Sequence, residues 1–170
     1  KREALINFFY QAIRPKVVLP DADERYVNLQ TYIAVERTFA QSDDALIVYE
    51  VLKLIQPSWF VYPLQNTESE TKQLFENLRL IQTSFKDPIS ESLSRYVKKN
   101  NPPFLLIRDF FNEHGSKARS ILENKEEFEQ KFSDLAHARY QLIGAKVRRA
   151  VIRSIIYIFL TKMVFAFALE

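Results

Sequence analysis

Apolar residues recur through most of the chain at spacings of three and four, the period of a helix with one buried face. The clearest stripe runs from Leu74 to Phe85 and predicts a helix that begins at Thr67. Helix-start patterns and prolines predict the other helices over residues 1–14, 21–41, 45–55, 88–99, 104–111, 116–123 and 125–169. The pattern predicts an all-α, multi-helix bundle of about 6 to 8 helices, whose long C-terminal helix is bent or continuous near Gly144.

Polar residues in front of several segments predict where the helices begin. Asp21 and Thr67 each stand three residues before a glutamate, which is the spacing of a capping box. Ser42 is the expected cap of the next helix, and Asp87 stands before a proline suited to a first helical turn. The segment 45–55 is apolar on nearly all sides, so we expect it at the centre of the fold. Its β-branched residues leave a strand as the alternative.

The helical pattern stops between Pro57 and Pro63, where three aromatic residues occur together. Proline at both ends keeps this segment out of a regular helix. We expect it to fold back and cover the core, and an exposed docking loop is the alternative.

The last segment, residues 135–169, is first basic and then apolar. It contains six cations and no acid. The twenty residues 150–169 would form a helix of about 30 Å, the thickness of the hydrocarbon layer of a bilayer. Eleven of them are Leu, Ile, Val or Phe, whereas Lys162 opposes insertion by about 3 kcal/mol. We therefore expect a helical domain over residues 1–145 and a terminal helix over 146–170 that inserts into a membrane or completes a core.

Two sets of side chains in this segment are the candidate contacts. Most of the cations share one side of the helix, where they suit anionic lipid headgroups or other phosphates. The candidates for membrane or phosphate contact are Arg139, Lys146, Arg148, Arg149 and Arg153. The candidates for membrane insertion or partner binding are Ile152, Ile155, Ile156, Phe159, Leu160, Met163 and Phe167.

Composition and charge narrow the class of protein. Two glycines in 170 residues suit helices, because sheets and tight hairpins normally use more. The net charge is +3, but the last 36 residues hold six cations and one acid, and the first 134 hold 18 cations and 20 acids. Because the basic charge belongs to one segment, a general nucleic-acid-binding domain is disfavoured. The chain has no cysteine, which excludes disulfides and thiolate metal sites.

No motif for catalysis or cofactor binding stands out. Asp134 and His137 share a helix face, but a di-iron bundle needs several more inward glutamates and a second histidine in the same pattern. No glycine-rich phosphate loop or serine elbow occurs. We expect no catalytic residue, cofactor, metal or small-molecule substrate, and the sequence favours a non-catalytic protein over an enzyme.

These patterns favour a helical interaction or assembly domain on the cytoplasmic side of a membrane, since cations directly before an apolar span mark that side. The alternative is a soluble helical bundle that binds a partner protein, or a second copy, through its C-terminal helix. Nucleic acid is the least favoured partner. The chain begins at Lys1 without a methionine and stops in mid-pattern at Glu170, so we expect a fragment of a longer protein.

Overall fold

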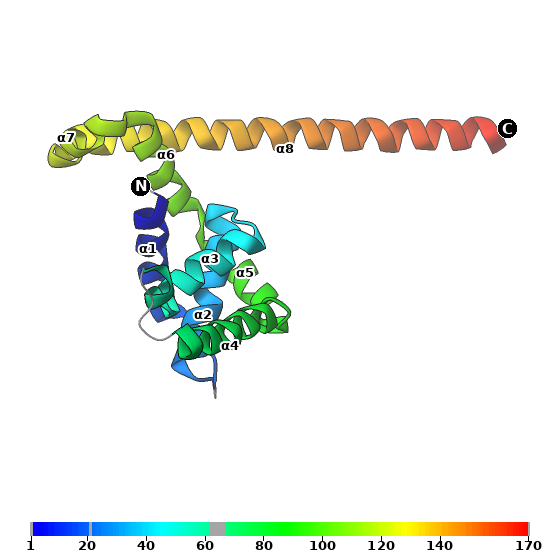
Figure 1. Cartoon of the computed structure of the whole chain (residues 1–170). Helices are drawn as coiled ribbons and strands as arrows, with labels where there is room; N and C mark the ends of the chain where they lie inside the picture. The colour runs from blue at the N-terminus through cyan, green and yellow to red at the C-terminus, as the bar shows by residue number, and fades with distance from the viewer. Residues whose placement is uncertain (1, 21, 62–66, 170) are drawn as a thin grey trace. The chain divides into compact units, whose positions relative to one another are not determined.

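The computed structural model describes residues 2–20, 22–61 and 67–169, and at 163, 164 and 166–169 it describes the backbone alone. Every regular element in these ranges is helical, so the all-α prediction is confirmed. The longer helices are α1 (Arg2–Ile13), α2 (Glu24–Val35), α3 (Asp44–Ile55), α4 (Thr67–Phe85), α5 (Pro88–Asn100), α6 (Pro102–His114), α7 (Ala118–Glu123) and α8 (Lys125–Leu169) (Figure 1). Shorter turns form η1 (Arg14–Lys16), η2 (Glu36–Ala40), η3 (Pro57–Phe60) and η4 (Gly115–Lys117).

The chain packs as two compact units, Lys1–Leu105 and Leu106–Glu170, each with its own apolar cluster. The first unit contains α1 to α5 and the start of α6. The second contains the rest of α6 with α7 and α8. The expected division at residue 145 concerns which segment meets a membrane or a partner, and it stays a prediction.

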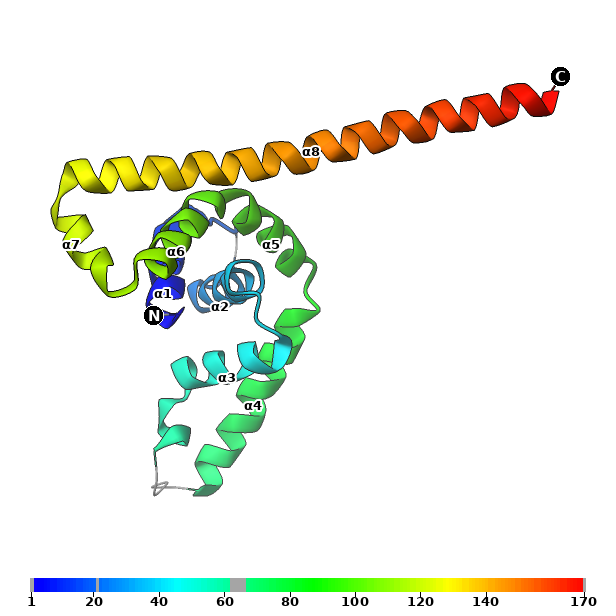
Figure 2. The same cartoon turned by 90° about the horizontal axis from the view of Figure 1, so that it is seen from above.

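Helix α2 is the centre of the first unit, where it packs against α1, α3, α4 and α5 (Figure 2). Its residue Ile33 is completely buried, and so are the polar residues Gln30 and Thr31. The Gln30 amide donates to the Ser84 carbonyl at 3.1 Å, and the Thr31 hydroxyl donates to a carbonyl one turn earlier at 2.7 Å. These donors are therefore satisfied inside the core.

Helix α3 is not the central helix that its apolar composition suggested. Ile47 and Val51 are buried, whereas Tyr49 and Leu54 keep about half of their surface exposed. A single face of α3 therefore packs on the core. The prediction was wrong because apolar residues can also lie on the surface. Which face of α3 is buried depends on the helices that pack against it.

The helix starts agree in part with the predicted caps. Asp87 caps α5 as expected, because its carboxylate accepts a hydrogen bond from the Ile89 N–H at 2.9 Å. At α3, however, the cap is Asp43, which accepts from the Leu46 N–H at 2.8 Å. Ser42, the expected cap, lies one residue earlier, and its hydroxyl donates to the Glu36 carboxylate instead.

Glu70, which was expected to close a capping box, binds another segment of the first unit. Its carboxylate accepts hydrogen bonds from the side chains of Gln56 and Ser58, both at 2.8 Å. This contact ties η3 to α4. The predicted cap at Asp21 falls outside the described residues, and α2 begins after Asp23.

The aromatic segment after α3 is described up to residue 61, and this part does not cover the core. Phe60 is 42% exposed and packs edge-on against the exposed ring of Tyr49, with 5.4 Å between the ring centroids. The expected plug is therefore wrong for this part, because the Phe60 ring lies on the outer side of α3. Residues 62 and 63 fall outside the description.

The second unit is a small hairpin of helices. Gly115 adopts a positive φ of 53° and ends α6 in the left-handed conformation that favours glycine. The chain then turns through α7, which packs against α8. The buried centre consists of Phe110, Ala118 and Ile121.

Candidate membrane-contact helix

The N-terminal part of α8 is anchored in the second unit. The Phe110 ring meets the ring of Phe128 edge-on at 5.4 Å and lies 6.3 Å from that of Phe132. Leu135, one turn further, also packs against this cluster. The side chains up to Leu135 therefore hold α8 against α6 and α7. The helix then runs on without a break to Leu169, so it is continuous through Gly144.

Arg139 differs from the other four cationic candidates because it has a carboxylate partner. Its guanidinium donates to Asp109 on α6, and the same carboxylate pairs with Arg108 at 3.2 Å. The Arg139 side chain is only 31% exposed. This ion pair extends the anchored part of α8 by one turn, so Arg139 contributes to the packing of its own unit.

The remaining cationic candidates are exposed and lie beyond the anchored part. Arg149 donates to the Ala145 carbonyl at 3.3 Å on the same helix. In the part of the chain that the structure describes, no carboxylate pairs with any of the four, and α8 carries no acid after Asp134. They form the cationic cluster Lys146, Arg148, Arg149 and Arg153.

The apolar candidates are also exposed. Ile152, Ile155, Ile156, Phe159 and Leu160 each expose between 50% and 67% of their surface. Val151, Tyr157 and Ile158, which point to other sides of the helix, are as exposed as these five. The side chains of Met163 and Phe167 are outside the description. A helix this apolar on all sides is normally covered by another apolar surface.

A helix must be both long and apolar to cross a bilayer. Among the described residues none combines the necessary length and apolarity. The prediction that α8 is a transmembrane helix is corrected accordingly. Lys162 interrupts the described apolar run, and a charge near the middle of a span costs about 3 kcal/mol.

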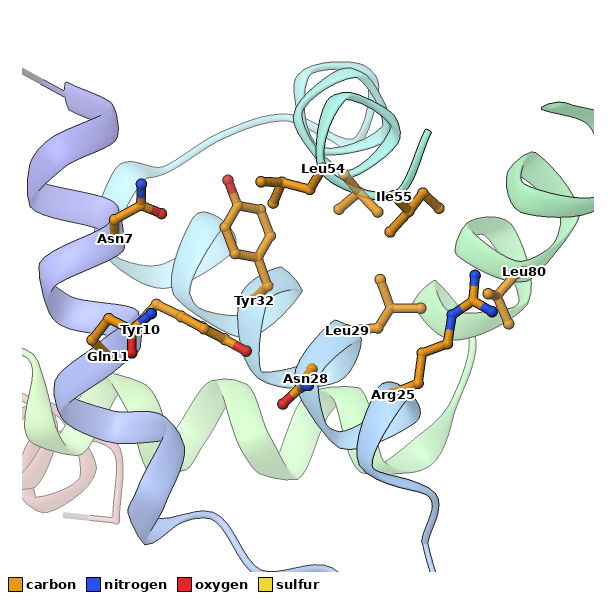
Figure 3. Close-up of a pocket in the computed structure, with 11 residues that line it drawn as sticks. Asn7, Tyr10, Gln11, Arg25, Asn28, Leu29, Tyr32, Leu54, Ile55 and Leu80 are labelled. Carbon is orange, nitrogen blue, oxygen red and sulfur yellow. The ribbon is translucent and has the colours of Figure 1, made fainter. Parts of the chain in front are cut away.

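A cavity in the first unit was missed by the sequence reasoning. It has a volume of about 370 Å³ and lies between α1, α2, α3 and α4 (Figure 3). Its aliphatic lining consists of Leu29, Val51, Leu54, Ile55 and Leu80. No sequence motif marks it, because its residues are single helical positions between Asn7 and Leu80 that only the packing brings together.

Comparison with known proteins adds no functional information, because no protein family, curated protein or solved structure matches this chain. The described residues also bring together no group of three or more histidine, aspartate or glutamate side chains that could hold a metal ion. The exposed part of α8 and the cavity are therefore the two candidate sites of this chain.

Proposed function

We propose that this chain is a non-catalytic helical interaction domain that associates with the cytoplasmic surface of an anionic membrane through α8. The observation that supports this proposal is the exposed run from Leu142 to Leu160, which combines uncovered Ile, Phe and Leu side chains with an unpaired cationic cluster. Cytoplasmic leaflets carry anionic lipids, and basic segments beside apolar ones are typical of proteins on that side.

Charge favours lipid over a second copy of the chain as the surface that covers α8. Residues 135–169 hold six cations and no acid. Two such segments placed side by side would bring like charges together with no carboxylate to pair them, which is unfavourable. An anionic lipid surface instead supplies phosphates for the cations and an apolar layer for Ile and Phe.

Two energetic terms support the association. Each basic residue near an anionic surface contributes about 1 kcal/mol, so the four-residue cationic cluster contributes roughly 4 kcal/mol. Burial of each exposed Ile or Phe side chain adds up to about 1.5–3 kcal/mol. The first term is screened by salt and the second is not, so binding should weaken at high ionic strength without vanishing.

Co-sedimentation of the purified chain with phosphatidylcholine vesicles, with and without phosphatidylserine, tests the proposal. The test variant replaces the cationic cluster with glutamine: Lys146→Gln, Arg148→Gln, Arg149→Gln and Arg153→Gln. A matched control removes four exposed cations from the first unit: Lys72→Gln, Arg79→Gln, Lys86→Gln and Arg95→Gln. Both variants change the net charge by the same amount.

We expect the wild type and the control variant to pellet with phosphatidylserine vesicles, and the α8 variant to stay largely in the supernatant. Equal pelleting of both variants would refute the assignment of the contact to α8. If the wild-type chain does not bind the vesicles but forms oligomers in analytical ultracentrifugation, the membrane proposal is wrong and α8 binds a protein partner instead.

A further inference from the structure

We infer that the cavity between α1, α2, α3 and α4 is a binding site for a small amphipathic carboxylate, an aliphatic or aromatic molecule with one anionic end. This inference is independent of the membrane proposal, because every lining residue belongs to the first unit and none to α8. Three features of the cavity carry it: its apolar wall, a single unpaired cation and its size.

The wall requires a ligand with an apolar body. Leu29 and Val51 are buried residues of the cavity lining, and Leu54 and Leu80 are exposed ones. The rings of Tyr10 and Tyr32, whose centroids lie 5.8 Å apart, add an aromatic surface. Concave sites with mainly apolar walls and a few polar groups are the usual form of small-molecule sites.

Arg25 determines the charge of the ligand. It rises from α2 beside Leu29, with its guanidinium near Leu80 of α4 (Figure 3). Within the described residues Arg25 has no hydrogen-bonded or ion-paired partner, and no acid is among the residues that line the cavity. A guanidinium presents paired N–H donors that match the two oxygens of a carboxylate. An anionic end at Arg25 is therefore complementary to this cavity.

The cavity lining also includes three neutral amides. Asn7 and Gln11 come from α1, and Asn28 comes from α2 (Figure 3). Asn28 already accepts a hydrogen bond from Arg14 through its oxygen, so its amide N–H groups remain available as donors. The cation beside these amides, Arg14, already donates to Asn28 and to the Val17 carbonyl. Among the described residues, Arg25 is therefore the cation of the lining that has no partner, and it is where we place the anionic end.

The volume limits the size of the ligand. A space of about 370 Å³ compares with about 30 Å³ for one water molecule in the liquid, which leaves room for roughly ten to twelve non-hydrogen atoms. Octanoate, with about ten such atoms, is a probe of suitable size and polarity. Octan-1-ol has the same chain without the charge, so it separates the apolar contribution from that of Arg25.

Methyl NMR titration of the full chain with each probe tests the inference and reports where the probe binds. We expect octanoate to shift the methyl signals of Leu29, Ile55 and Leu80. Arg25→Gln should weaken octanoate binding about tenfold, the loss expected for one charge-assisted hydrogen bond, and leave octanol binding unchanged. The matched control is Arg95→Gln, because Arg95 is an exposed arginine on α5 that does not line the cavity. This variant should change neither octanoate binding nor octanol binding.

Two results would overturn the inference. One is the absence of shifts at the cavity methyls, with any octanoate effect confined to Ile152 and Ile155 of α8. The other is equal weakening of octanoate binding by Arg25→Gln and Arg95→Gln, which would reduce the effect to net charge. Retained octanol binding shows that Arg25→Gln still folds, so loss of octanoate binding alone is informative.

Discussion

The buried carboxylate of Glu36 holds three parts of the first unit together, and its removal should be costly. Glu36 is completely buried. It accepts hydrogen bonds from Arg2 at 2.8 Å, from the Ser42 hydroxyl at 2.5 Å and from the Tyr32 hydroxyl at 3.2 Å. The network therefore joins the start of α1 and the chain before α3 to the end of α2.

The expected loss in the free energy of unfolding depends on which groups each substitution leaves without a partner. Breaking one partner of a buried ion pair costs about 3–5 kcal/mol. The Arg2 side chain is 41% exposed and regains water, so Glu36→Ala should fall at the lower end, near 3 kcal/mol. Glu36→Gln keeps an acceptor oxygen but loses the charge, so we expect about 1–2 kcal/mol.

Urea unfolding followed by tryptophan fluorescence measures these losses, because Trp59 is the only tryptophan and lies in the first unit. Glu76→Ala is the control, since Glu76 is exposed on α4, and it should change the free energy of unfolding by less than about 0.5 kcal/mol. A Glu36→Ala variant as stable as this control would refute the reasoning. Burial and then the nearby Glu36 charge raise the pKa of Tyr32, so Glu36→Gln should also lower it in an alkaline titration.

Three further predictions concern the same unit. Asp87→Ala removes the cap of α5 and should cost about 1 kcal/mol in urea unfolding. Hydrogen bonds from Tyr26 and from the Ile89 N–H hold the pKa of Asp87 below its ordinary value of 3.8. Its stabilising contribution is therefore complete above that value and is lost as the pH falls through the lower folded pKa; Asp87→Ala should lose this acid dependence. Phe9 is fully buried and stacks on Phe104 at 4.0 Å, so Phe9→Ala should cost about 3–5 kcal/mol and Phe9→Leu clearly less. Equal losses for the two Phe9 variants would contradict the packing account, as would an Asp87→Ala variant that keeps the wild-type acid dependence.

The sequence was sufficient where a helix carries its own signals. The stripe from Leu74 to Phe85 and the Asp87-Pro88 start are local patterns, and α4 and α5 form where these patterns predict. The central position of α2 could not be predicted in this way. Gln30 and Thr31 look like surface residues, and the burial of Gln30 depends on the Ser84 carbonyl, which lies 54 residues further along the chain.

The same distinction between local patterns and distant contacts applies to the candidate sites. The order of cations before apolar residues in α8 is visible in the sequence because it is local. The pairing of Arg139 with Asp109 joins residues thirty positions apart, so only the fold separates Arg139 from the four exposed cations. The cavity is even harder to predict from the sequence, because Arg25 and Leu80 come from different helices and neither is unusual in its own segment.

The most direct test of the membrane proposal is to place a fluorescent probe on the exposed run of α8. The chain has no cysteine, so Ile156→Cys can be labelled at one site with a polarity-sensitive nitrobenzoxadiazole dye, and Ser92→Cys on α5 serves as the control position. We expect phosphatidylserine vesicles to shift the emission of the probe at position 156 to shorter wavelength and to leave the probe at position 92 unchanged. An unchanged spectrum at position 156, under conditions where the chain is folded, would contradict the proposal that α8 meets the membrane.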